Sequence, residues 1–192
     1  MIGCMEYIAL IILMGILGIL VAVALVYVWV FITDIRGWRS CGPWVGTRSR
    51  AIPYIVDALD LGADTHFVLH EIGSGDGRMA RAFAKKFPNA DIVGVDFSLP
   101  LVLASRIITH LKGIKNIKFI AVNALYTDLS KADVVYCYNL PGILNGKLGE
   151  KFKKELRPGT IILSYGFEIT GFHMKKMIQI PDRGGRLFVY TI

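Results

Sequence analysis

Three glycines at alternate positions form the stretch of this chain that is best suited to bind a ligand. Gly73, Gly75 and Gly77 follow the apolar run 67–69, which has the length and composition of a buried strand. Apolar residues at helical spacing follow over 79–84, so we predict that the glycines lie on a turn between a strand and a helix. Glycine accepts positive φ and lets a ligand approach the backbone, while the free N–H groups that open the helix face that ligand. The pattern therefore predicts a nucleotide-type site.

The spacing of the glycines separates this turn from two other nucleotide-binding patterns. A dinucleotide-binding turn reads G-x-G-x-x-G, but the sixth position here is Arg78, and the pattern G-x-x-x-x-G-K-[ST] is absent. Residues 91–96 are predicted to form the next strand, which ends in Asp96, 23 residues after Gly73. A carboxylate there can bind a ribose diol; the alternative, a solvated acid at a strand end, is less favoured beside the glycines. With the acidic Glu71 before it, G-x-G-x-G resembles motif I of the class I S-adenosylmethionine-dependent methyltransferases.

This resemblance implies roles for residues at the carboxyl ends of the predicted strands, where ligands of an open parallel sheet bind. The glycine turn would take the methionine part of S-adenosylmethionine, with Glu71 near its amino group. Asp96 would bind the ribose and Phe97 would pack against the adenine. Asn123 stands where many relatives have an aspartate that binds the adenine amine, and an amide oxygen can accept the same bond. The residues expected to bind the cofactor are Glu71, Gly73, Ser74, Gly75, Asp76, Gly77, Asp96, Phe97, Asn123 and Ala124.

The turn Tyr138-Asn139-Leu140-Pro141 follows the fourth predicted strand, next to where the transferable methyl group would lie. Methyl transfer to an amine is a direct displacement that needs a neutral nucleophile, alignment and exclusion of water more than an acid or a base. Amide and carbonyl oxygens of this turn could orient an amine, and Tyr138 or Tyr165 could wall a channel. An ordinary strand-ending turn is an equal alternative. We therefore predict substrate-positioning residues but no catalytic acid or base.

The elements that must position these residues alternate strand and helix from Thr65 onward, which predicts an α/β fold with a mostly parallel sheet. A further helix is expected over 52–61, stopped by Gly62. The tail after the fifth strand reads as an antiparallel hairpin, and about nine residues separate the two, so the usual fifth crossover helix is missing or vestigial. The predicted strands are 66–72, 91–96, 117–122, 133–138, 160–165, 175–180 and 186–191, and the predicted helices are 77–87, 99–111 and 145–156. The class I resemblance makes this a Rossmann-like methyltransferase sheet.

The N-terminal segment differs from the rest of the chain because it is long, apolar and uncharged. Residues 7–32 contain no charge and, at 1.5 Å per residue, extend roughly 39 Å as a helix, enough to cross a bilayer core of about 30 Å. A cleaved signal peptide would have a basic start and a shorter apolar core, whereas aromatic residues at 27, 29 and 31 here resemble an interfacial belt. Basic residues at 36, 39, 48 and 50 follow the span and none precedes it. The positive-inside rule therefore predicts a single-pass protein with its C-terminal domain on the cytoplasmic side.

Charge and residue composition limit the kinds of partner that this chain is expected to bind. Residues 33–192 carry all 22 lysines and arginines but 14 of the 15 acidic residues, so the domain is basic. The surface of an anionic bilayer leaflet is the favoured partner of such a domain. No arginine-rich arm or aromatic-basic motif supports nucleic acid, so no nucleic-acid partner is expected. The four histidines and three cysteines have no metal-site spacing, so no metal is expected. We predict an anchor over 1–33, a juxtamembrane connector without regular structure over 34–50, and the methyltransferase domain over 51–192.

The order of these pieces resembles the small membrane-anchored seven-β-strand protein-lysine N-methyltransferases, relatives of the mitochondrial enzymes that modify the ATP synthase c-subunit and the adenine nucleotide translocase. The segments that stand in place of the family's P-Y-V-P-T-P and D-L-G-S-G-D-G-R are Pro43-Trp44-Val45-Gly46-Thr47 and Glu71-Ile72-Gly73-Ser74-Gly75-Asp76-Gly77-Arg78. The resemblance implies lysine methylation of a membrane or membrane-associated protein, with Trp44 and Thr47 near cofactor and substrate. Two alternatives remain open: methylation of a lipid or small amphiphile, and a non-catalytic membrane scaffold that binds the cofactor.

Overall fold

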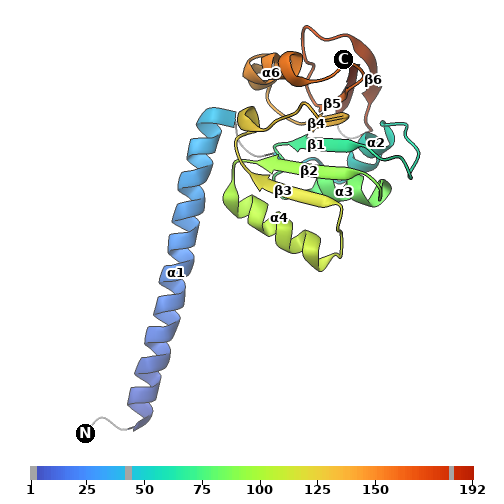
Figure 1. The fold of residues 1–192 in the computed structure, drawn as a ribbon. Helices are drawn as coiled ribbons and strands as arrows, with labels where there is room; N and C mark the ends of the chain where they lie inside the picture. Colours follow the sequence, from blue (N-terminus) through green and yellow to red (C-terminus); the bar gives the residue numbers. More distant parts are fainter. Residues whose placement is uncertain (1–3, 42–44, 182–183) are drawn as a thin grey trace.

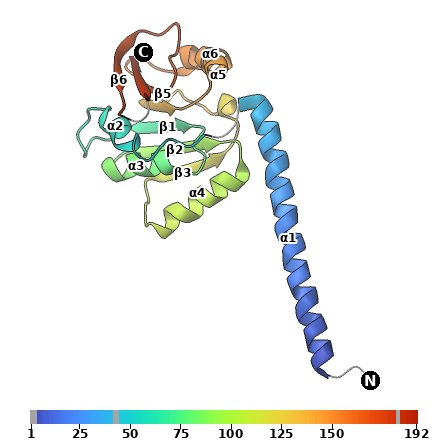
Figure 2. The ribbon, with the colours of Figure 1, turned by 180° about the vertical axis from the view of Figure 1, so that it is seen from behind.

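The computed structural model describes residues 4–41, 45–181 and 184–192, and it begins with one long helix. Helix α1 (Cys4–Cys41) extends away from a separate α/β domain (Figures 1 and 2). Its segment Tyr7–Val28 is long and apolar enough to cross a membrane, and none of this segment is buried against the rest of the chain. The expectation of irregular structure from residue 34 was wrong as far as Cys41. Elongating an existing helix avoids the cost of nucleation, and the single Gly37 there opposes it by only about 1 kcal/mol.

The domain is built on one seven-stranded sheet with the order β3-β2-β1-β4-β5-β7-β6. Its parallel part is β1 (Val68–Ile72), β2 (Asp91–Asp96), β3 (Ile117–Ala121), β4 (Val134–Cys137) and β5 (Ile161–Tyr165). The hairpin of β6 (Met174–Gln179) and β7 (Arg186–Thr191) completes it, with β7 antiparallel between β5 and β6. The predicted mostly parallel sheet with a C-terminal antiparallel hairpin is thereby confirmed. No helix lies between β5 and β6, whose connecting residues are all described, as the short connection predicted.

Helices cover both faces of the sheet. One face is covered by α2 (Ile52–Asp57), α3 (Arg78–Lys86) and α4 (Leu99–Leu111). The short α5 (Pro141–Leu144) and α6 (Lys147–Glu155) pack on the other face, beyond the 3-10 turn η1 (Ala124–Tyr126). Helix α2 ends four residues before the predicted end, because the chain tightens after Asp57 into turns and Asp60 takes a positive φ of 48°. Leu59, which lies within the predicted helix but after the observed one, is nevertheless buried.

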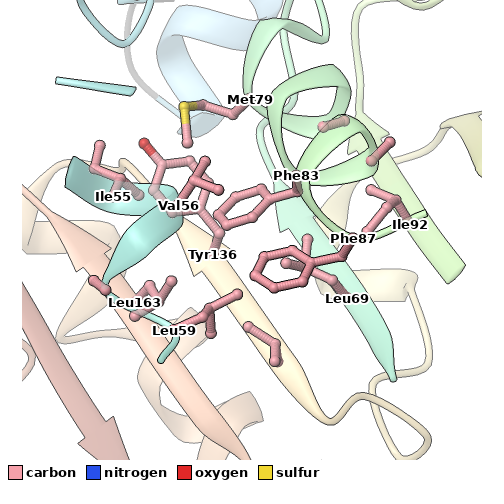
Figure 3. Packing of buried hydrophobic residues seen from close by; sticks show 14 of the residues in the cluster. Ile55, Val56, Leu59, Leu69, Met79, Phe83, Phe87, Ile92, Tyr136 and Leu163 are labelled. Carbon is pink, nitrogen blue, oxygen red and sulfur yellow. The ribbon is translucent and has the colours of Figure 1, made fainter. Parts of the chain in front are cut away.

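The larger core cluster lies between the sheet and helices α2 and α3 (Figure 3). Phe83 of α3 and Phe87, which directly follows that helix, pack in the same cluster as Leu69 of β1. The ring of Phe83 meets that of Tyr136 of β4 at a centroid distance of 5.8 Å. Side chains of this size bury enough apolar surface to contribute about 1.5–3 kcal/mol each. The cluster therefore holds the start of α3, and with it the glycine turn, against the carboxyl ends of β1 and β4.

Candidate functional site

The glycine turn joins β1 to α3 as predicted. Gly73, Gly75 and Gly77 all have positive φ, at 75°, 53° and 71°, a region that glycine enters without the penalty of a Cβ. The N–H groups of Gly73 and Ser74 donate to the carbonyl of Val95 on β2, at 2.8 and 2.9 Å. The turn is thus fixed by the neighbouring strand.

Phe119 of β3 explains why two of the nearby glycines cannot carry a side chain. A Cβ at Gly77 would lie 2.5 Å from Cζ of Phe119, and a Cβ at Gly94 of β2 would lie 2.5 Å from Cδ1 of the same ring. The ring therefore packs directly on the backbone of the turn and of β2. Nothing in the glycine pattern points to Phe119, which sequence reasoning missed; only its apolar type within a predicted strand marks it.

Asp96 closes the turn from the side of β2. Its Oδ2 accepts a hydrogen bond from the N–H of Gly75 at 2.7 Å, and its Oδ1 accepts one from the N–H of Ser98 at 2.8 Å. A carboxylate has about four lone-pair sites and can accept more than one hydrogen bond at each oxygen. Ser105 of α4 adds a bond from its Oγ to the carbonyl of Gly75 at 3.0 Å. Asp96 thus shapes the turn as well as offering acceptors beside it.

Glu71 lies at the end of β1, buried under the first turn of α3. Its Oε2 accepts a hydrogen bond from the N–H of Ala80 at 2.8 Å, one of the free donors that open the helix. Burial raises the pKa of this carboxyl well above its usual value, the Ala80 bond opposes the rise, and the nearby carboxylates of Asp76 and Asp96 add to it. Glu71 is therefore a buried acid whose charge would be stabilised by a cation placed in the adjoining cavity.

Asp76 and Arg78 form a paired charge at the rim of the turn. The guanidinium donates from Nε and Nη2 to the carboxylate, with the shortest contact 2.7 Å, and from Nη1 to the carbonyl of Thr47 at 3.2 Å. Burial alone would raise the pKa of Asp76, but the bonds from Arg78 outweigh it and lower the pKa below its usual value. Arg78 therefore ties the segment after α1 to the glycine turn.

Thr47 meets a tyrosine that sequence reasoning missed. The hydroxyls of Thr47 and Tyr136 are 2.7 Å apart in a buried hydrogen bond that joins positions 89 residues apart. The available signal was the spacing of Tyr136 from Tyr138, since alternate residues of a strand share one face. Trp44, predicted beside Thr47, lies outside the described residues. A cavity between this segment and the turn is lined by Val45, Gly46, Thr47, Glu71, Gly73, Ser74, Asp76, Arg78, Met79, Tyr136 and Tyr138.

Aromatic rings stand beside this cavity where β4 and β5 end. The ring of Tyr138 lies 4.8 Å from that of Tyr165 and 6.5 Å from that of Phe167 between centroids, the second pair stacked at 22°. Gly166 takes a φ of 85°, and a Cβ there would lie 2.8 Å from Cε2 of Tyr138. The chain therefore passes close under the ring, and the expected aromatic wall includes Phe167 as well as the two predicted tyrosines.

Asn139 is the polar residue that follows this wall. Its Oδ1 is buried without a hydrogen-bond partner within the described part of the chain, as is Oγ of Ser74 in the glycine turn. Its Nδ2 lies 3.4 Å from the place that a Cβ of Gly73 would take. A buried amide oxygen left without a donor costs about 1–3 kcal/mol, so this atom is suited to a donor that arrives with a ligand.

The remaining predicted residues lie around the same carboxyl edge with less direct roles. Pro141 is the first residue of α5, and Leu140, which is 43% exposed, directly precedes that helix. Phe97 is half-buried after β2. Asn123 uses its Oδ1 to cap η1, accepting from the N–H of Leu125 at 3.0 Å, which leaves one lone pair of that oxygen. Ala124 is the first residue of η1. Over residues 4–41, 45–181 and 184–192, no group of three or more His, Cys, Asp or Glu side chains could hold a metal ion.

Comparisons with known proteins agree with this fold and with a methyltransferase. The model of the ANTKMT methyltransferase domain family matches residues 71–176. A protein-lysine N-methyltransferase of Saccharolobus islandicus (strain REY15A) is 28% identical over 149 residues, covering 77% of this chain and 91% of the relative. The structure of an RNA methyltransferase from Salinibacter ruber with S-adenosyl-L-homocysteine is 26% identical, with a TM-score of 0.70 over 77% of this chain and 94% of the other. That of a SAM-dependent methyltransferase from Geobacter sulfurreducens with the same ligand is 21% identical, with a TM-score of 0.55 over 80% and 58%.

Proposed function

The chain belongs to the ANTKMT methyltransferase domain family, and from that premise we propose that this S-adenosylmethionine-dependent methyltransferase methylates the side-chain amine of lysine in a membrane or membrane-associated protein. The name of the Saccharolobus relative supports lysine as the acceptor. The apolar segment of α1 supports a membrane setting. The single observation in the domain that carries the proposal is the unpartnered oxygen of Asn139 beside an aromatic wall.

The residues around the glycine turn fit S-adenosylmethionine, which supplies an electrophilic methyl group on a sulfonium sulfur. Gly73 is exposed, and the nearest atom to a Cβ built on it is Nδ2 of Asn139, so backbone and amide together form a narrow cradle. The buried carboxyl of Glu71 is suited to an ammonium group, which would oppose the rise of its pKa. The carboxylate of Asp96, fixed beside the turn by the N–H groups of Gly75 and Ser98, is of the type that accepts hydrogen bonds from ribose hydroxyls.

Asn139 would orient the acceptor. A neutral lysine amine carries two N–H donors and one lone pair, and the lone pair must point at the methyl carbon for displacement. A hydrogen bond from one N–H to Oδ1 of Asn139 leaves the lone pair free and fixes its direction. An amine held in this way would form the new N–C bond as the methyl–sulfur bond of S-adenosylmethionine breaks, and the electron pair of that broken bond would remain on sulfur.

The rings of Tyr138, Tyr165 and Phe167 would enclose the lysine side chain. Their flat, apolar faces exclude water and pack on its methylene groups, and the faces attract the cation that forms as methyl is transferred. A narrow aromatic channel suits an unbranched amine better than a lipid with two acyl chains. This distinction favours lysine over the lipid alternative that the sequence left open.

A transfer assay with the full chain tests this proposal. We expect labelled methyl groups from S-adenosylmethionine to appear in membrane proteins of the source cell and, after acid hydrolysis, as methylated lysine. Asn139→Ala should lower kcat at least tenfold with little change in cofactor affinity, whereas Asn89→Ala, which changes an exposed amide bonded to the carbonyl of Asp64, should leave both unchanged. Label recovered only in lipid or in RNA, or full activity in Asn139→Ala, would contradict the proposal. Cofactor binding without transfer to any acceptor would indicate the scaffold instead.

A further inference from the structure

Helix α4 buries two small polar side chains beside one apolar residue, while several of its large apolar side chains face outward. The buried residues of α4 are Val102 and Ser105, which have no exposed surface, and Thr109, which is 5% exposed. The outer side carries large apolar side chains at every fourth position, so that they share one face of the helix. These are Leu99, Leu103, Ile107 and Leu111, exposed by 42%, 44%, 60% and 78%. A contiguous exposed apolar stripe of this kind marks an interaction surface rather than ordinary surface variation.

Charge around this stripe has one sign. From Phe97 to Thr127 the sequence contains four lysines and arginines and no acidic residue. Lys112, Lys115 and Lys118 are exposed in the segment that leaves α4 and enters the edge strand β3. An apolar helix face flanked by cations is the composition that binds the interfacial region of an anionic bilayer. A partner protein of ordinary mixed charge would not require the complete absence of acids.

The connection between the apolar segment of α1 and the domain also favours a lipid bilayer as the partner of this surface. Sixteen residues lie between Val28, the end of the apolar segment, and Val45, so even a fully extended connection holds the domain within about 60 Å of the bilayer. Figures 1 and 2 both show α4 on the side of the domain toward which the N-terminal part of α1 extends. The stripe is therefore on the side that a membrane-inserted α1 would turn toward the lipid.

We propose that the outer face of α4, formed by Leu99, Leu103, Ile107 and Leu111, docks on the anionic surface of the bilayer that α1 spans. This inference rests on the membrane setting of the proposed function and deepens it. Helix α4 begins three residues after Asp96, so docking brings the carboxyl edge of the sheet to the lipid surface. Tyr126, 82% exposed at that edge, is of the type that settles at membrane interfaces. The acceptor is then a lysine at the membrane–water boundary of a neighbouring protein.

Depth-dependent quenching of the full chain in vesicles of phosphatidylcholine and phosphatidylglycerol tests the docking. An environment-sensitive fluorophore is attached at Leu17→Cys, Ile107→Cys or Lys154→Cys, each in a chain with Cys4→Ser and Cys41→Ser. The third cysteine, Cys137, is fully buried and burial raises its pKa to about 12, so it will not react. Spin-labelled lipids should quench position 17 deep in the bilayer and position 107 at headgroup depth. Position 154, on α6 over the other face of the sheet, should remain unquenched.

The outcomes separate the docking from the anchor. Quenching at 17 with none at 107 would overturn the docking of α4 alone, and no quenching at 17 would overturn the membrane setting as well. Efficient cross-linking between two copies through position 107, without lipid quenching, would identify a dimer face and equally overturn the proposal. Leu103→Glu together with Ile107→Glu should lower transfer to a membrane-embedded acceptor several-fold and leave transfer to a soluble lysine peptide unchanged. Equal loss with both acceptors would contradict a docking role.

Discussion

Gly77→Ala tests whether the ring of Phe119 holds the glycine turn. The substitution adds a Cβ at a residue with a φ of 71° and sets it 2.5 Å from Cζ and 2.8 Å from Cε1 of that ring. Two penalties then combine: the left-handed backbone and the steric overlap. Gly113→Ala is a matched control, because Gly113 has a φ of 65° and nothing lies within 4 Å of its added Cβ.

The expected magnitudes follow from this geometry. The backbone penalty is about 1–2 kcal/mol for a residue with a Cβ, so Gly113→Ala should lower the free energy of unfolding by about that amount. Overpacking a filled core site adds about 1–3 kcal/mol, because the ring, sandwiched between Gly77 and Gly94, has little room to withdraw. Gly77→Ala should therefore cost about 2–5 kcal/mol, a large part of the stability of a domain of this size.

Urea unfolding of the full chain in mild detergent, followed by circular dichroism, measures both variants. Phe119→Leu in the Gly77→Ala background should recover part of the loss, giving a coupling energy of about 1–3 kcal/mol, whereas the same change beside Gly113→Ala should be additive. Calorimetry should find weaker binding of S-adenosylmethionine in Gly77→Ala only. Equal destabilisation by the two glycine substitutions, with no coupling to Phe119, would refute the reasoning.

Three further predictions concern polar groups of the same site. Asp96→Asn sets an amide donor against a backbone N–H, so it should cost about 1–3 kcal/mol in urea unfolding and also weaken cofactor binding; unchanged stability would contradict the bond to Gly75. The pKa of Glu71 is raised in the fold, so the native state keeps a proton that the unfolded chain loses above pH 4.5, and stability should fall as pH rises from there through the raised value. Urea midpoints across that range should show the fall, and Glu71→Gln should abolish it. Tyr136→Phe leaves the hydroxyl of Thr47 buried without its partner and should cost about 1–3 kcal/mol, with Thr47→Val recovering part of the loss in the double variant.

Local patterns predicted the elements and the turn well, for a physical reason. The boundaries of α4 and β2, the hairpin, and the positive φ of the three glycines depend on side-chain periodicity and backbone sterics within a few residues. The site prediction also placed Asp96 and Asn139 at one edge, because parallel strands end together. The helical stretch 34–41 was missed, since glycine and proline nearby were weighted above the low cost of extending an existing helix.

Contacts between distant segments could not be predicted in this way. The sequence by itself determined that residues 99–111 form a helix, but their apolar side chains are spread around that helix and did not determine which side faces the sheet. Tertiary structure decided this: Val102, Ser105 and Thr109 face inward, and the hydroxyl of Ser105 donates to a backbone carbonyl of the glycine turn. Likewise, the sequence determined a glycine turn, but only the folded chain brought Phe119 against its backbone. Which face of an element is buried depends on the shape and polarity of what lies across from it, and no local period contains that information.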